Sequence, residues 1–114
     1  MYVDTRRKIA KLSEWTPVSL KPTVSGYFDP LLALHVERLE RLAGELGPLT
    51  VILMNPADAI LPAEARAKVL AGLACVAQVL LPDGAPLPTA VLHMEDEDAV
   101  LRAGFLQHVL DRQA

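Results

Sequence analysis

Residues 26 to 36, GYFDPLLALHV, combine side chains that could handle a phosphate group. Gly26 would let the backbone turn sharply or approach a ligand closely, because glycine carries no Cβ atom. Asp29 followed by Pro30 is typical of a helix start, where free backbone N–H groups and the helix dipole can hold a phosphate. His35, further along that helix, could donate a hydrogen bond to the phosphate or, when protonated, stabilise negative charge. The stretch therefore predicts a strand-to-helix turn that can bind an anion.

The polar residues of this stretch also have structural interpretations. Asp29 would cap the helix whether or not a ligand binds. A single histidine on an amphipathic helix, as at His35, can equally be a structural or solvated residue. His93 and His108 have no supporting partners in the sequence, so we interpret them as structural. Capping and catalysis remain alternatives for the opening stretch at this point.

Two further sets of charged residues have simple interpretations as solvated groups. Arg66 is interpreted as a surface ion-pair residue, with Glu64 or Glu37 as its partner. The acidic run 95–98 lies where a helix is expected to begin, and the positive end of the helix dipole accounts for it. The spacing of that run resembles no calcium loop. The sequence therefore predicts no metal site there.

Hydrophobic periodicity and the positions of glycine and proline divide the chain into helices and strands. Apolar residues at intervals of three and four predict a helix over 30–46, which Gly44, Gly47 and Pro48 end. The other expected segments are a polar helix over 4–14, strands over 21–27, 49–54 and 76–81, and helices over 62–74 and about 95–112.

The order strand, helix, strand, helix, strand predicts a small α/β Rossmann-like sandwich, with a short parallel sheet and flanking helices. We expect one domain over 1–114, with an N-terminal helix and linker to residue 20, a core over 21–82, and a loop and C-terminal helix over 83–114. Ligands of such sheets bind at the carboxyl ends of the strands. The loop that contains Asp29 follows the first predicted strand, so it lies where a site belongs.

Composition excludes several classes of function. The chain has 114 residues, 52% of them hydrophobic, and a net charge of −3, so nothing in it attracts nucleic acid over a large surface. Its one cysteine, Cys75, permits neither an intrachain disulfide nor a cysteine-based zinc site. No signal peptide and no apolar run of the length of a membrane span are found, so a reduced, cytoplasmic setting is expected.

The segment VSGYFDPLLALHVERLERLAGELG resembles the first motif of the cytidylyltransferase-like nucleotidyltransferases, G-x-F-D-x-x-H-x-G-H-v-x-x-L. This family includes glycerol-3-phosphate cytidylyltransferase and the nucleotidyltransferase domain of the ADP-heptose synthesis enzyme. The matching residues are Gly26, Phe28, Asp29, His35, Val36 and Leu39. A second segment, residues 61–82, resembles the family's R-x-x-x-L-x-x-L-x-x-V-D-x-V region. Its matching residues are Arg66, Leu70, Leu73, Val76 and Val79.

The chain departs from the family pattern where the chemistry lies. The resemblance implies two histidines that bind the nucleotide phosphates and a glycine between them that leaves room for the nucleotide. Leu32 stands at the first histidine position, Leu34 at the glycine position and Ala77 at the aspartate position of the second motif. No stretch like the family's later I-S-[ST]-T-x-[IL] motif is found. Because the loss of one preorganised donor lowers a rate on the order of 100- to 1000-fold, these departures together predict weak or lost catalysis.

Three functions follow as alternatives from the resemblance. The first is a degenerate nucleotidyltransferase-like domain that binds CTP, ATP or a phosphate ester through Gly26, Tyr27, Phe28, Asp29 and Arg66, with His35 as the remaining catalytic residue. Mg²⁺ is expected only where a nucleotide is bound. The second is an active nucleotidyltransferase in which His35 and a lysine such as Lys21 replace the usual pair. The third is a non-catalytic homodimeric interaction module, since small members of this fold commonly form dimers.

Overall fold

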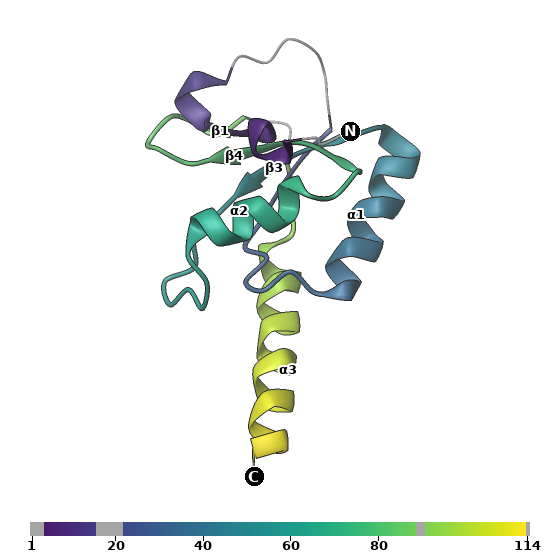
Figure 1. Ribbon diagram of the computed structural model, residues 1–114, viewed down its shortest axis with the longest axis vertical. Coiled ribbons are helices and arrows are strands. Elements are labelled where there is room, and N and C mark those ends of the chain that lie inside the picture. The colour runs from purple at the N-terminus through teal and green to yellow at the C-terminus, as the bar shows by residue number, and fades with distance from the viewer. Residues whose placement is uncertain (1–3, 16–21, 89–90, 114) are drawn as a thin grey trace.

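A five-stranded parallel sheet with the strand order β1-β4-β3-β2-β5 forms the centre of the computed structural model (Figure 1). The structure describes residues 4–15, 22–88 and 91–113. The strands are β1 (Ile9–Lys11), β2 (Thr23–Gly26), β3 (Leu49–Leu53), β4 (Val76–Leu81) and β5 (Val91–His93). The helices are α1 (Ala33–Leu46), α2 (Ala63–Ala71) and α3 (Glu95–Gln113), with short 3₁₀ turns η1 (Thr5–Lys8) and η2 (Leu12–Glu14). The predicted fold class, a small Rossmann-like α/β fold, is confirmed.

The main core lies between the sheet and the helices α1 and α2. Alternate residues of β3, such as Val51 and Leu53, point toward this core, where they join Leu39 of α1 and Leu70 of α2. A smaller cluster on the other set of strand positions contains Ile52, Leu80 and Leu12. Every residue of β3 is buried, as the continuous apolar run LTVILM predicts for a strand covered on both faces.

The two edge strands were not expected from the sequence. Residues 4–14 form η1, β1 and η2, so the predicted polar helix is wrong. The spacing of Ile9 and Leu12 suits a helix, but in the fold Ile9 to Lys11 pair with Val79 to Leu81 along β4. On the opposite edge, β5 pairs with β2, with His93 beside Ser25. Tertiary pairing thus decides the conformation of both short segments.

Helix α1 begins three residues later than predicted. Asp29 and Pro30 lie before the helix, in the turn that follows β2, and the peptide bond between them is cis. The residue at the N-cap position is Leu32, not Asp29. At the other end Gly47 has a φ of 97° and donates its N–H to the carbonyl of Ala43, so it ends the helix as expected. Gly44 lies inside the helix.

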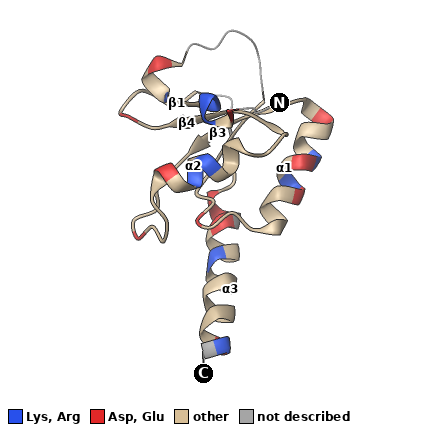
Figure 2. Cartoon of the chain, in the orientation of Figure 1, with Lys and Arg blue, Asp and Glu red and all other residues tan. Residues whose placement is uncertain are grey.

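Helix α3 leaves the sheet at its first turns and extends away from the other elements (Figure 1). It packs on β2 near its start. Its middle part, residues 103–110, carries no Asp, Glu, Lys or Arg, as the uncoloured stretch of the helix in Figure 2 shows. No helix among the described residues is both long enough and apolar enough to cross a membrane.

Candidate functional site

The loop after β2 lies at the switch point of the sheet, where successive strands are added first on one side of β2 and then on the other. From β2 the chain proceeds through β3 to β4 on one side, and β5 returns to pair with β2 on the other side. In open parallel sheets this switch point, at the carboxyl ends of the strands, is where ligands bind. The turn of residues 27–32 and the start of α3 meet here, so the predicted position of the site agrees with the topology.

Gly26 makes close packing of this turn possible. A Cβ atom on Gly26 would lie 2.5 Å from Oδ2 of Asp98 and 2.7 Å from the ring of Phe28. Phe28 itself is fully buried and has a φ of 47°, an unusual conformation for a residue with a bulky side chain. Gly26 was expected either to allow a sharp turn or to allow a close approach, and the fold uses the close approach. The groups that approach Gly26 are the side chains of Asp98 and Phe28, not a ligand.

Asp98, in the first turn of α3, is the centre of the site. Its Oδ2 accepts hydrogen bonds from the backbone N–H groups of Tyr27 at 2.6 Å and Phe28 at 3.4 Å. Its Oδ1 lies 2.7 Å from Nε2 of His35, and both side chains are only 2% exposed. The ring N–H is not aligned with the oxygen, so this pair is an electrostatic contact rather than a regular hydrogen bond. The expectation that the whole acidic run is solvated is thus wrong for Asp98.

His35 has both ring nitrogens engaged by the protein. Nδ1 accepts a hydrogen bond from the N–H of Leu32 at 2.9 Å, which assigns the ring proton to Nε2, the atom that faces Asp98. The ring also packs edge-on against Phe28, with the centroids 5.3 Å apart. His35 in this arrangement holds the start of α1 against α3, and neither nitrogen points to a free space.

Asp29 joins two loops instead of capping α1. Its carboxylate is buried and accepts the N–H groups of Ile60 at 2.6 Å and Leu61 at 2.8 Å, in the loop before α2. Arg102 of α3 approaches the same carboxylate, with its Nε 3.7 Å from Oδ2. The predicted capping role is therefore wrong, and the free N–H groups that Asp29 satisfies belong to another segment.

Arg66 is buried, so its interpretation as a surface ion-pair residue is wrong. Its guanidinium donates to the carbonyl groups of Tyr27 at 2.9 Å, Met54 at 3.0 Å and Leu61 at 3.0 Å, and to Oδ1 of Asn55 at 2.7 Å. Burial lowers the pKa of Arg66, and the nearby charge of Asp29 opposes that shift. Arg66 thus ties α2 to the loops that follow β2 and β3.

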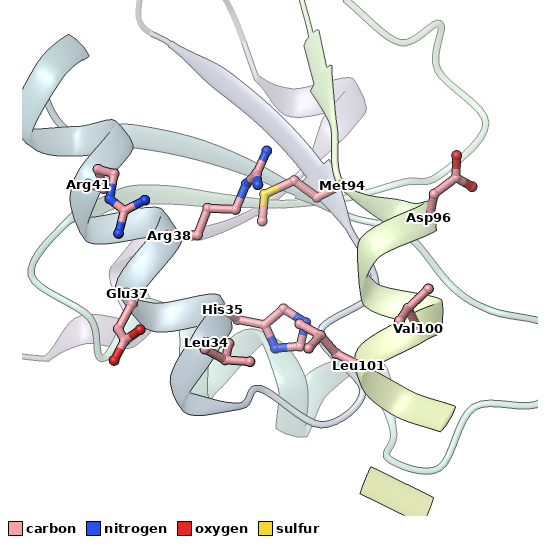
Figure 3. Close-up of a pocket in the computed structure, with 9 residues that line it drawn as sticks. All are labelled: Leu34, His35, Glu37, Arg38, Arg41, Met94, Asp96, Val100 and Leu101. Atoms are coloured by element: carbon pink, nitrogen blue, oxygen red, sulfur yellow. The ribbon is translucent and has the colours of Figure 1, made fainter. Parts of the chain in front are cut away.

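A cavity of about 570 Å³ lies beside His35, between α1 and α3 (Figure 3). Leu34, Arg38 and Arg41 line it from α1, and Val100 and Leu101 line it from α3. The remaining lining residues are His35, Glu37, Met94 and Asp96. Leu34 is 58% exposed and forms part of the wall, so it does not close the space, and Leu32 is not among the lining residues.

A second polar cluster lies one residue before the end of β2, where it meets the end of β5. The buried Ser25 hydroxyl donates to Oε1 of Glu95 at 2.6 Å and lies 2.8 Å from Nδ1 of His93. His93 is 66% exposed on its side chain, and Ser25 is inaccessible, so the cluster fixes the junction of β5 and α3. The partners of His93, an interpreted structural residue, come from a strand pairing that the sequence did not reveal.

The described residues contain no group of three or more His, Cys, Asp or Glu side chains that could hold a metal ion. The carboxylates of Asp29 and Asp98 face backbone N–H groups, so these residues do not fit a dedicated Mg²⁺ site. Lys21, the alternative phosphate-binding lysine, lies outside the described residues. Cys75 is a half-buried free thiol whose pKa is raised by burial, which makes it a weak nucleophile.

Fold and site together define the chain as a small Rossmann-like α/β domain with a closed switch-point turn and a cavity beside it. No protein-family model matches the chain, and no curated protein matches it in sequence.

Proposed function

We propose that the chain is a degenerate domain of the cytidylyltransferase-like class that binds a small phosphate-bearing molecule and does not transfer a nucleotidyl group. Binding is supported by the cavity beside His35, which has Arg38 and Arg41 in its lining. The observation that carries the loss of transfer is the convergence of the Tyr27 N–H, the Phe28 N–H and the His35 ring on Asp98. These are the donors that a phosphate at this turn would need. The protein's own carboxylate uses them.

Electrostatics favours loss of transfer over an active enzyme with altered ligands. A phosphate that entered the turn would meet the buried side chain of Asp98, whose oxygens already accept the N–H groups that the phosphate would need. An anion placed there without those donors is costly to desolvate. The positions of Leu32 and Leu34 add no donor that could compensate. His35 is oriented by Leu32 and Asp98, so its role in this proposal is to position α1.

Pyrophosphate release tests this function directly. The wild-type protein, incubated with Mg²⁺, CTP or ATP and a series of phosphate esters such as glycerol 3-phosphate, should release pyrophosphate at the rate of a protein-free control. A true glycerol-3-phosphate cytidylyltransferase serves as the positive control. Release above background that disappears in His35→Ala would contradict the proposal and support the active enzyme. Calorimetric titration with CTP and ATP measures binding separately from turnover.

A second candidate function, a homodimeric interaction module, is favoured by one feature of α3. Phe105, Leu106, Val109 and Leu110 recur at spacings that place them on one face of the projecting, uncharged part of this helix. Leu110 is exposed in the single chain. A surface without charges suits a partner surface that also lacks them, and a two-fold axis would bring two copies of this face together.

Light scattering distinguishes this candidate from a monomeric domain. A dimer that separates when Leu106→Glu and Leu110→Glu are combined would support it. The matched control is Val69→Glu, an exposed apolar position on α2. A wild-type protein that stays monomeric at high concentration would exclude the module.

A further inference from the structure

The cavity between α1 and α3 has the dimensions of a small-molecule site. Its volume of about 570 Å³ falls within the range of roughly 300–1,000 Å³ that is typical of ligand pockets. Figure 3 shows the two helices facing each other, with Leu34, Arg38 and Arg41 on one wall and Val100 and Leu101 on the other. The cavity adjoins the turn at His35, and the donors of the turn itself are engaged by Asp98.

The lining is apolar except for charged groups of both signs. Leu34, Met94, Val100 and Leu101 provide apolar surface that a hydrocarbon or aromatic body could cover. His35 contributes its ring but no free nitrogen, because Leu32 and Asp98 engage both. The apolar part of a ligand therefore has the larger share of the contact surface.

Arg38 and Arg41 supply the positive charge of the cavity. They follow Leu34 by four and seven residues, so the three side chains share one face of α1. A guanidinium is suited to a carboxylate or phosphate, which it can bind through two parallel hydrogen bonds. Both arginines belong to the α1 wall, so they can act on one anionic group at the same end of a ligand.

The carboxylates of Glu37 and Asp96 limit how much negative charge the cavity accepts. Asp96 lies on α3, and Glu37 lies directly before Arg38 and four residues before Arg41 on α1. A single phosphate or carboxylate can contact the arginines, whereas the extended charge of a triphosphate would also approach these two acids. The charge pattern favours a ligand with one anionic group.

We propose that this cavity binds an amphipathic anion, a monoester phosphate with a compact apolar body, and that Leu34 forms the apolar wall that selects such a body over a nucleotide. This inference rests on the proposed function, in which the domain binds a phosphate-bearing molecule without converting it, and it names the class of that molecule. The arginines hold the phosphate, and Leu34, Val100 and Leu101 cover the apolar body.

Phenyl phosphate is the probe, with inorganic phosphate and CTP for comparison, and NMR titration of the full chain gives the dissociation constants. Phenyl phosphate should bind at least about 10-fold more tightly than inorganic phosphate, which lacks an apolar body, and than CTP. The double variant Arg38→Ala with Arg41→Ala should weaken phenyl phosphate binding by at least about 10-fold. Leu34→Ala, which keeps a good helix former in α1, should weaken it by about 5-fold.

Arg112→Ala is the matched control, because Arg112 is an exposed arginine at the far end of α3 and does not line the cavity. Equal binding of phenyl phosphate and inorganic phosphate, CTP binding as tight as that of phenyl phosphate, or unchanged binding in the double arginine variant would overturn the inference. So would no phenyl phosphate binding at about 10 mM. The proposed loss of transfer is judged separately, by pyrophosphate release, so either conclusion can fail while the other stands.

Discussion

At the scale of single residues, Asp98 determines what the turn after β2 can do. Its two oxygens contact two backbone N–H groups and one imidazole, and the side chains of Asp98 and His35 are buried together. A buried carboxylate is stable only with such partners, and the partners are stable only with the carboxylate. The contacts that stabilise the turn also use the donors that an anion would need there.

Asp98→Asn should destabilise the fold although the two side chains have nearly the same shape. The amide oxygen can still accept the N–H of Tyr27, but the amide NH₂ would then face the protonated Nε2 of His35. His35 cannot switch tautomer freely, because Nδ1 accepts the N–H of Leu32. We expect the free energy of unfolding to fall by about 1–3 kcal/mol, the usual result of an unsatisfied buried group. Urea denaturation gives the value.

Asp96→Asn is the control for that experiment, since Asp96 belongs to the same helical turn and is exposed. Its effect should stay within about 0.5 kcal/mol. A loss in Asp96→Asn as large as that in Asp98→Asn would mean that the helix dipole, and not the buried contact, accounts for the effect.

Gly26→Ala should lower the free energy of unfolding, mainly through a steric clash and not through the backbone preferences of glycine. The new methyl group would lie 2.5 Å from Oδ2 of Asp98 and would contact the buried ring of Phe28. Neither group can move without losing its own contacts, so we expect a loss of about 1–3 kcal/mol by thermal or urea unfolding. Gly44→Ala is the opposite case, because the space beside Gly44 in α1 is open. It should stabilise the helix by roughly 0.5–1 kcal/mol.

Local signals in the sequence predict part of the site and leave out its centre. Glycine at position 26 and aspartate at position 29 mark a turn, and their positions at the carboxyl end of a strand follow from the pattern. The partner of this turn, Asp98, lies about 70 residues away in an acidic run that the helix dipole already explains. A single sequence contains no sign that distinguishes the one buried carboxylate of that run from its exposed neighbours.

At the scale of elements, Arg66 couples α2 to the ends of β2 and β3. Its four donor contacts, with Tyr27, Met54, Asn55 and Leu61, join the loops after β2 and β3 to the loop before α2. Lysine carries the same charge but only a point-like ammonium group, which cannot reach carbonyls in a planar fork.

Arg66→Lys should therefore lower the free energy of unfolding by about 2–4 kcal/mol, since hydrogen bonds to charged groups contribute about 1.5–3 kcal/mol each. Chemical denaturation measures this loss. Lys68→Ala, at an exposed position two residues further along α2, should change the value by no more than about 0.5 kcal/mol. If both variants lost the same stability, the effect would come from helix α2 itself and not from the coupling of the loops.

Long, periodic elements could be predicted from the sequence, and short edge elements could not. An apolar run or a helical repeat in the sequence is enough to predict the longer elements, which are β3, β4, α1 and α2. β1 and β5 have three residues each, which is too few for a pattern to show. Their conformation depends on pairing with β4 and β2, and that pairing depends on the finished sheet.

At the scale of the whole molecule, the two edge strands close the sheet with segments from both ends of the described chain. β1 comes before the β2-to-β4 core in sequence and β5 comes after it, yet both belong to one hydrogen-bonded sheet. α3 follows β5 directly and carries Asp98 into the turn after β2. The outer part of α3, in contrast, extends beyond the sheet and the other helices (Figure 1).

Hydrogen exchange should divide α3 into two parts. The amide of Asp98 is held in the docked first turn, where it donates to the carbonyl of Met94, and it should exchange only with larger openings of the fold. The last two turns, near Leu110, gain little from packing, and an isolated helical end frays readily. At low micromolar protein concentration we expect their amides to exchange on the order of 100-fold faster or more. Protection of the outer turns that rises with protein concentration would show that a second copy covers them, and slow exchange there at every concentration would contradict a projecting helix.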